Sequence, residues 1–340
     1  MATSPRMTLQ SNGDLSSITN EIDENVQKFF PFIPNSIQLH THGTSKSAGT
    51  FKLTIHQSSS GKTADFFLKT VPDNIGQAMI RGEFSGLNAL YDIKPGIVPR
   101  PIGWGTYSSN PEIHFLLNEF VEMDDINTIE GRSEFCALLA ELHKISAGRS
   151  PTGKYGFDVT TYAGIMHRDN SWCDTWEEFF FRAMRNAADQ EKEVHGQSPE
   201  LDELVHQLHE KVIPRLLRPL ANGKNPIQPC LVHGDIWRGN VAINGRTKKP
   251  IMLDPAAFWA HHEYELGNSN VSQYILGYEW IQEYHKHMPV SEPVEDYEGR
   301  RFLYALYVTC HDRSIRTDGC SHGHFCASIL NPETQRHRNR

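Results

Sequence analysis

The sequence predicts an α+β protein of two lobes, a small β-rich lobe followed by a larger helical lobe. Three observations predict this layout. Apolar and polar residues alternate in short strands between about residues 35 and 122. Apolar residues then recur at helical spacing over most of the remaining chain. Finally, 340 residues are enough to build two lobes around sizeable cores. The polar pair Asp124-Asp125 marks the expected boundary between the lobes.

Four elements are expected in the first lobe. Residues 51–56 and 63–71 alternate as strands, and the Ser- and Gly-containing stretch 58–62 between them predicts a hairpin turn. Apolar residues at positions 80, 84, 87 and 90 predict a helix over 80–90. The apolar run 113–118 predicts a buried strand that leads into the connection between the lobes.

The second lobe is expected to be helical, with helices over residues 135–143, 176–184, 201–217 and from 303 onward. From residue 310 the chain turns polar, basic and aperiodic. The predicted organisation is therefore a flexible segment over 1–26, a first lobe over 27–122, a helical lobe over 123–309, and an atypical, poorly ordered tail over 310–340.

Composition restricts the function classes. The formal net charge of -8 argues against nucleic acid as the main partner. No apolar stretch approaches the roughly 18 residues needed to cross a membrane, and the first 20 residues lack the apolar core of a secretory signal. The six scattered cysteines do not form a disulfide framework in a chain of this length. We therefore expect a cytoplasmic protein with no nucleic-acid or membrane partner.

The most informative motif joins His233-Gly234-Asp235 to Asn240 and Asp254. Phosphoryl transfer needs a carboxylate to orient and deprotonate the accepting hydroxyl, and oxygen ligands to hold Mg²⁺ against ATP. The order Asp-x4-Asn…Asp is that of protein-kinase-like catalytic and metal-binding loops. We predict Asp235 as catalytic base and Asn240 and Asp254 as Mg²⁺ ligands, with His233 locking the loop. Each residue alone could equally be an ordinary turn or strand-end residue.

The same chemistry requires a cation on the ATP phosphates. Lys69 closes a predicted strand, and Glu83 lies fourteen residues later in the following helix, so we predict that Glu83 holds Lys69 in place. A surface lysine in a strand is the alternative. The backbone of Glu119, Phe120 and Val121 is expected to bind adenine, although these residues could be only a linker.

Two further segments carry weaker signals. Residues 42–50 lie where a phosphate-covering loop belongs, but their glycines do not fit G-x-G-x-x-G. A group of cysteines and histidines near the end invites a zinc interpretation, yet its spacing matches no standard zinc finger. These residues are Cys310, Cys320, His322, His324 and Cys326.

Together these residues resemble the fructosamine/ketosamine-3-kinase family, within the aminoglycoside- and choline-kinase-like superfamily. The resemblance covers about residues 35–308. It rests on the runs His-Gly-Asp-Ile-Trp-Arg-Gly-Asn-Val-Ala over 233–242, Asp-Pro-Ala-Ala-Phe-Trp-Ala-His over 254–261, and Glu-Tyr-Glu-Leu over 263–266. Lys-Tyr-Gly-Phe over 154–157 and the aromatic residues of 172–180 add to it. It implies a two-lobed protein-kinase-like fold.

The resemblance also implies an activity: ATP- and Mg²⁺-dependent phosphorylation of the 3-hydroxyl of ketosamines on glycated proteins or small amines, with ribulosamines favoured over fructosamines. The alternatives are a kinase of another small hydroxylated amine, such as an aminoglycoside or choline, and an inactive nucleotide-binding protein. Residues 310–340 depart from the family's apolar helices. They read as unrelated sequence, as from an altered reading frame or a retained intron, which would cost stability.

Overall fold

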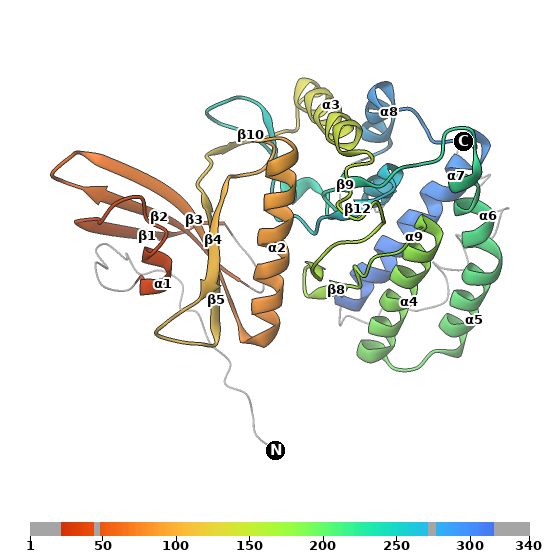
Figure 1. Cartoon of the computed structure of the whole chain (residues 1–340), viewed down its shortest axis with the longest axis horizontal. Coiled ribbons are helices and arrows are strands. Elements are labelled where there is room, and N and C mark those ends of the chain that lie inside the picture. Colours follow the sequence, from red (N-terminus) through yellow and green to blue (C-terminus); the bar gives the residue numbers. More distant parts are fainter. Residues whose placement is uncertain (1–21, 44–47, 271–276, 316–340) are drawn as a thin grey trace, which may run out of the picture.

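The computed structural model describes residues 22–43, 48–270 and 277–315. Figure 1 shows two lobes side by side, a strand-rich lobe built from the first third of the chain and a helical lobe built from the rest, with helix α2 facing the boundary. The predicted two-lobed α+β architecture is therefore confirmed.

The first lobe contains one antiparallel sheet of five strands in the order β1-β2-β3-β5-β4. The turn between β2 and β3 falls where the sequence predicts a hairpin. The strands are β1 (Ser36–Thr41), β2 (Gly49–Gln57), β3 (Lys62–Pro72), β4 (Pro101–Thr106) and β5 (Ile113–Glu119).

Strand β3 has two faces because successive side chains alternate across a sheet. Phe66 and Leu68 belong to the core on one face, which also contains Val26 of the short helix α1 (Glu24–Gln27). Val71 belongs to the core on the opposite face, packed with the long helix α2 (Asp73–Ile93). Lys69 shares the parity of Val71 and therefore lies on the α2 side of the sheet.

The prediction of a flexible segment over 1–26 is wrong for its last five residues. Ile22 and Val26 are buried against the sheet, and Asp23 caps α1 by accepting a hydrogen bond from the Asn25 backbone N–H at 2.9 Å. Two apolar residues four apart suffice for one turn of helix to cover the sheet. Residues 1–21 lie outside the described residues.

The second lobe packs its helices around an aromatic-rich core that includes Phe179, Phe180 and Tyr304. The predicted helix over 201–217 is one helical run, interrupted by a wider π-helical turn, Leu208–Val212. The helices are α3 (Ile129–Ser146), α4 (Trp176–His195), α5 (Pro199–Gln207), α6 (Ile213–Leu217), α7 (Pro219–Asn222), α8 (Tyr278–His287) and α9 (Tyr297–Ile315).

Short strands and 3₁₀ turns between these helices carry the candidate site. Strands β9 and β12 pair with each other, β7 pairs with β8, and β10 pairs with β11 and β6. These elements are β6 (Met123–Asp124), β7 (Thr161–Ala163), β8 (Met166–Arg168), β9 (Cys230–Val232), β10 (Val241–Asn244), β11 (Pro250–Met252), β12 (Phe258–Ala260), η2 (Arg238–Asn240), η3 (His262–Asn270) and η4 (Val294–Asp296).

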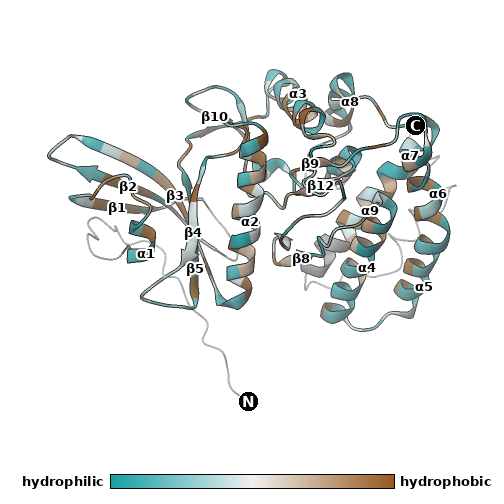
Figure 2. Cartoon of the chain, viewed as in Figure 1, coloured by the Kyte–Doolittle hydropathy of each residue, from teal (hydrophilic) through white to brown (hydrophobic). Residues whose placement is uncertain are grey.

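Helix α9 continues to Ile315 and so extends into the segment 310–340, for which the sequence predicts an atypical, poorly ordered tail. The apolar residues 303–307 anchor the helix, and its hydrogen-bonded turns extend through the polar residues that follow. Residues 316–340, which contain most of the proposed zinc ligands, lie outside the described residues. Figure 2 shows hydrophilic and hydrophobic residues mixed along α4, as expected of a helix buried on one face. Within the described part of the chain, no helix combines the length and apolarity needed to span a bilayer.

Candidate active site

The pair predicted between Lys69 and Glu83 is present. The Lys69 Nζ atom lies 2.7 Å from Glu83 Oε2 and 3.7 Å from Asp254 Oδ1. Burial alone would lower the pKa of Lys69, but the carboxylates of Asp254 and Glu83 raise it above its usual value. The amine is therefore protonated, and it lies at the junction between β3, α2 and the segment that carries Asp254.

Close packing fixes α2 against that segment. Gly86 lies less than one turn after Glu83, and a Cβ atom added there would sit 3.3 Å from the Ala257 Cβ atom and 3.5 Å from Pro255 Cγ. A larger side chain at position 86 would push the helix away from the segment. The glycine thus lets α2 hold Glu83 close to Lys69 and Asp254.

The loop after β9 is locked by His233. Its Nε2 atom lies 2.9 Å from the Leu253 carbonyl oxygen, and its Nδ1 atom accepts from the Asp235 backbone N–H at 3.3 Å. Burial lowers the pKa of His233, so the ring is neutral, with its proton on Nε2. The prediction that this histidine locks the loop through hydrogen bonds is confirmed.

Position 234 accommodates only a residue without a side chain. Its φ is +83°, and an added Cβ atom would lie 2.3 Å from the Ala256 carbonyl oxygen. On the other side, Glu265 Oε1 accepts from the Gly234 N–H at 2.9 Å, and Glu265 Oε2 accepts from the His233 N–H at 2.5 Å. Burial would raise the pKa of Glu265, but the adjacent His143 ring and the hydrogen bond from the Gly234 N–H lower it, so the carboxylate stays ionised.

The structure brings Asp235, Asn240 and Asp254 together. Asn240 Nδ2 donates to the Asp235 carbonyl oxygen at 2.9 Å and to Asp235 Oδ2 at 3.2 Å, which leaves its side-chain oxygen for a cation. The Leu253 N–H donates to the Asn240 carbonyl oxygen at 2.9 Å and so ties Asp254 to the same loop. Asp254 has a φ of +50°, and its side chain is 52% exposed, open to a ligand.

Asp235 lies in an environment suited to proton transfer. Burial raises its pKa to about 7, assisted by the nearby carboxylates of Asp254 and Glu265 and opposed by the Arg168 guanidinium and the Asn240 hydrogen bond. A carboxyl with a pKa near neutrality can both accept and release a proton. Asp235 thus supplies a carboxyl group of raised pKa. Asn240 and Asp254 supply oxygen donors of the type that Mg²⁺ prefers.

The predicted adenine-binding residues lie in the connection between the lobes. The N–H groups of Glu119 and Phe120 donate to the carbonyl oxygens of Arg100 and Asp65, at 2.9 and 3.4 Å. Because those two amides already donate hydrogen bonds within the protein, the Glu119 carbonyl and the Val121 backbone are the groups that could form hydrogen bonds with adenine. The loop after β1 approaches this connection, because the rings of His42 and Phe120 lie 4.9 Å apart. Residues 44–47 of the proposed phosphate-covering loop lie outside the described residues.

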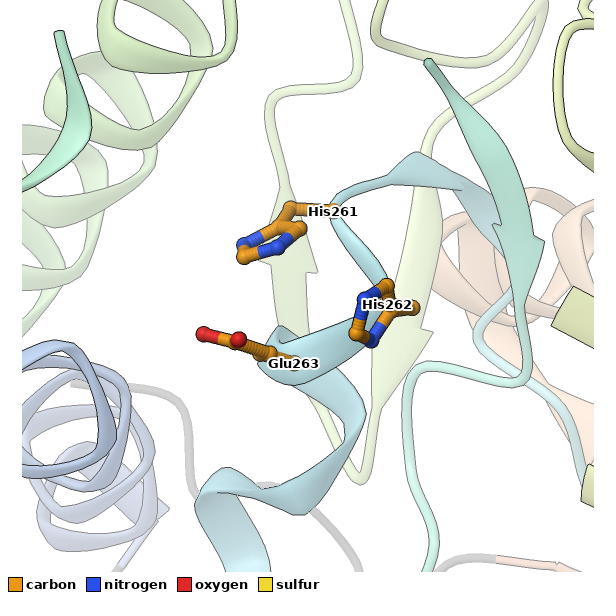
Figure 3. A group of neighbouring side chains, drawn as sticks. All are labelled: His261, His262 and Glu263. Atoms are coloured by element: carbon orange, nitrogen blue, oxygen red, sulfur yellow. The ribbon is translucent and has the colours of Figure 1, made fainter. Parts of the chain in front are cut away.

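Figure 3 shows a second group of potential ligands, His261, His262 and Glu263. Their nitrogen and oxygen atoms lie within 4.8 Å of one another, but their neighbours already engage them. The Arg300 guanidinium contacts both Glu263 oxygens, at 2.7 and 3.0 Å, and the two His261 nitrogens lie 2.8 Å from the Tyr304 and Ser291 hydroxyls. This network joins η3 to α9 and supports the segment that carries Glu265. It does not fit a metal ion.

Two residues important to the site are missing from the prediction. Glu265 falls in the Glu-Tyr-Glu-Leu run, and that pattern could have suggested a role for it. Arg168 closes β8, is 3% exposed, and donates hydrogen bonds to the carbonyl oxygens of Ala256 and Gly234. Neither its spacing nor its neighbours in the sequence indicate this position.

A strand lysine paired with a helix glutamate, facing an Asp-Asn-Asp group across two lobes, defines a phosphotransferase of the protein-kinase-like class. Solved structures share the two-lobed fold. An aminoglycoside phosphotransferase, APH(4)-Ia, in complex with AMP-PNP and hygromycin B, matches with a TM-score of 0.56 at 12% identity, covering 87% of this chain and 91% of that one. A Haemophilus somnus 129PT protein, provisionally named a fructosamine-3-kinase, matches with a TM-score of 0.67 at 21% identity, covering 86% of this chain and 91% of that one.

The chain belongs to the fructosamine kinase family, whose sequence model matches residues 36–315. The match extends beyond residue 308, where the expected resemblance ends, and includes all of α9. The chloroplastic protein-ribulosamine 3-kinase of Arabidopsis thaliana is 31% identical over 249 residues, which cover 71% of this chain and 68% of that protein.

Proposed function

We propose that the protein transfers the γ-phosphoryl group of ATP to the 3-hydroxyl of a ketosamine, with ribulosamines preferred over fructosamines. One observation carries the proposal: Asn240 Nδ2 lies 3.2 Å from Asp235 Oδ2, and Asp254 Oδ1 lies 3.7 Å from Lys69 Nζ. Family membership and the ribulosamine 3-kinase of Arabidopsis support the substrate class.

The first lobe binds the nucleotide in this proposal. The protonated Lys69 amine contacts ATP phosphates, and Glu83 keeps it in position. The Glu119 carbonyl and the Val121 backbone contact adenine. Asn240 and Asp254 fit a Mg²⁺ ion, since both offer oxygen donors and the hydrogen bond from the Leu253 N–H to the Asn240 carbonyl oxygen joins their two loops. A bound Mg²⁺ would supply positive charge that stabilises the charge developing on the phosphates.

Asp235 orients the substrate hydroxyl and takes its proton. The hydroxyl oxygen forms a bond to the γ-phosphorus, the bond from that phosphorus to the β–γ bridging oxygen breaks, and ADP leaves. Because the transition state is loose, the proton moves late, and the main contribution of Asp235 is alignment. A pKa of about 7 keeps a large fraction of Asp235 ionised at neutral pH.

The substrates are glycated lysines on proteins or glycated small amines in the cytosol. Phosphate at the 3-position is a far better leaving group than hydroxide, and it lies β to the acidic position next to the C2 carbonyl. Elimination of the phosphate leaves an imine at C1, and hydrolysis of that imine by water then releases the unmodified amine. The activity would therefore serve to repair glycated amines.

The test is a substrate panel with Mg-ATP, measuring ADP release with ribulosyl-lysine, fructosyl-lysine, choline and an aminoglycoside. The proposal predicts turnover with the two ketosamines, and more of it with ribulosyl-lysine. Turnover only with choline or the aminoglycoside would replace the proposed substrate class. Nucleotide binding without turnover of any of the four would indicate an inactive nucleotide-binding protein.

A further inference from the structure

Arg168 connects the two loops that carry the proposed catalytic groups. Its Nη1 atom donates to the Ala256 carbonyl oxygen at 2.7 Å, and its Nη2 atom donates to the Gly234 carbonyl oxygen at 3.2 Å. Gly234 directly precedes Asp235, and Ala256 follows Asp254 by two residues. The two nitrogens of one planar group thus hold both loops at a fixed separation.

The guanidinium is itself held in orientation. It lies over the Phe258 ring, 4.4 Å from the centroid, and it contacts the hydroxyls of Tyr264 at 3.3 Å and Tyr307 at 3.4 Å. In the part of the chain that the structure describes, Arg168 forms no ion pair with a carboxylate. The guanidinium of the buried Arg300, by contrast, forms an ion pair with Glu263. Burying a cation that contacts no carboxylate is costly. Packing alone therefore does not explain why Arg168 donates its hydrogen bonds to two carbonyl groups of the active-site loops.

Gly234, the residue before Asp235, is held by hydrogen bonds at both its N–H and its carbonyl group. Glu265 accepts from the Gly234 N–H, and Arg168 donates to the Gly234 carbonyl oxygen. Since Asp235 follows that carbonyl, its position depends on both contacts. The short hairpin that carries Arg168 also packs on α2, where an added Cβ atom at Gly82 would lie 2.5 Å from the Thr160 carbonyl oxygen. The hairpin therefore touches both the catalytic loop and the helix that carries Glu83.

We propose that Arg168 is a positioning residue for phosphoryl transfer, which sets the separation between the loop of Asp235 and the loop of Asp254. The inference rests on the proposed roles of those two aspartates. Arg168 acts through the two backbone carbonyls. Its loss displaces Asp235 relative to Asp254, and a misplacement of about 1 Å can cost on the order of 100-fold in rate.

The experiment compares Arg168→Lys with Arg182→Lys. Lysine keeps the positive charge, but its single nitrogen cannot occupy both guanidinium positions. Arg182 is a matched control on the neighbouring helix, because it contacts Asp169 and Cys173 instead of the active-site loops. For Arg168→Lys we expect kcat to fall at least about tenfold while KM for ATP changes less than about threefold. For Arg182→Lys we expect both constants to change less than about twofold.

Hydrogen exchange supplies a readout that is independent of turnover. Arg168→Lys should speed exchange in both segments 233–240 and 253–257, whereas Arg182→Lys should leave them unchanged. Unchanged exchange in either segment, or a kcat equal to that of the Arg182→Lys control, would overturn the proposal. Absence of turnover in the unmodified protein would refute the proposed function instead, and the exchange comparison would still decide the role of Arg168.

If Arg168→Lys does not fold, Tyr264→Phe keeps the aromatic packing and removes only the hydroxyl that lies 3.3 Å from Arg168 Nη2. The proposal predicts a smaller loss of kcat, about two- to fivefold, with faster exchange in the same two segments. If Tyr264→Phe has the same kcat and the same exchange rates as the wild type, the proposal is overturned.

Discussion

Replacing Gly234 by alanine tests whether the close approach of two loops sets the active site. The added Cβ atom would lie 2.3 Å from the Ala256 carbonyl oxygen, so the loops must separate by about 0.7 Å to reach even 3.0 Å. The φ of +83° adds a conformational penalty of about 1–2 kcal/mol. Overpacking adds about 1–3 kcal/mol, so we expect a loss of about 2–5 kcal/mol in the free energy of unfolding.

The same displacement should slow the reaction. A shift of this size between Asp235 and Asp254 predicts a fall in kcat on the order of 10- to 100-fold. Gly196 provides the control, because its φ is +88° but no atom lies within 4 Å of an added Cβ. Gly196→Ala should show only the conformational penalty, with kcat unchanged.

Denaturant unfolding gives the stability of both variants, and steady-state ADP release with Mg-ATP and a ketosamine gives their kcat. The reasoning predicts that Gly234→Ala is clearly less stable than Gly196→Ala and much slower. If the two variants unfold at the same denaturant concentration and turn over equally fast, the contact between Gly234 and Ala256 does not set the geometry of the site.

Three further predictions concern other parts of the molecule. Lys69→Met should lower kcat/KM for ATP by about 10²-fold in a steady-state assay, because a preorganised cation on the phosphates is lost. Above about pH 5, the melting temperature of Asp23→Asn should be lower than that of the wild type. The difference should shrink as the pH falls below about 4. Burial would raise the pKa of Asp23, but several hydrogen bonds hold it well below its ordinary value, so its contribution is lost on protonation, as melts from pH 3 to 7 would show. Arg300→Leu should cost about 3–5 kcal/mol by denaturant unfolding because it leaves Glu263 buried and unpaired, whereas removing the exposed Arg218 should change the stability far less.

The sequence could predict those parts of the site that depend on local geometry. A strand followed directly by a helix places Lys69 and Glu83 within reach of each other, and the fourteen-residue spacing was sufficient to identify the pair. The Asp235-to-Asn240 spacing similarly fits one turn-rich loop, and the paired strands β10 and β11 return the chain to Asp254.

The remaining parts depend on contacts between residues far apart in the chain. Arg168 bonds to carbonyl groups 66 and 88 residues away, and those partners are backbone atoms with no sequence signature. Helix α1 is a single turn, too short for a periodic pattern to appear, and only the sheet beneath it explains why it forms. Such features arise from tertiary packing, which residue spacing does not encode.

The central claim is that Asp235 acts at a Mg-ATP site formed with Asn240 and Asp254. Single-turnover transfer of phosphate from Mg-ATP to ribulosyl-lysine, compared between the wild type and Asp235→Asn, tests it most directly. The account predicts a chemical step at least about 100-fold slower in the variant, with unchanged affinity for ATP. Equal rates in the two proteins would remove Asp235 from the reaction and contradict the account.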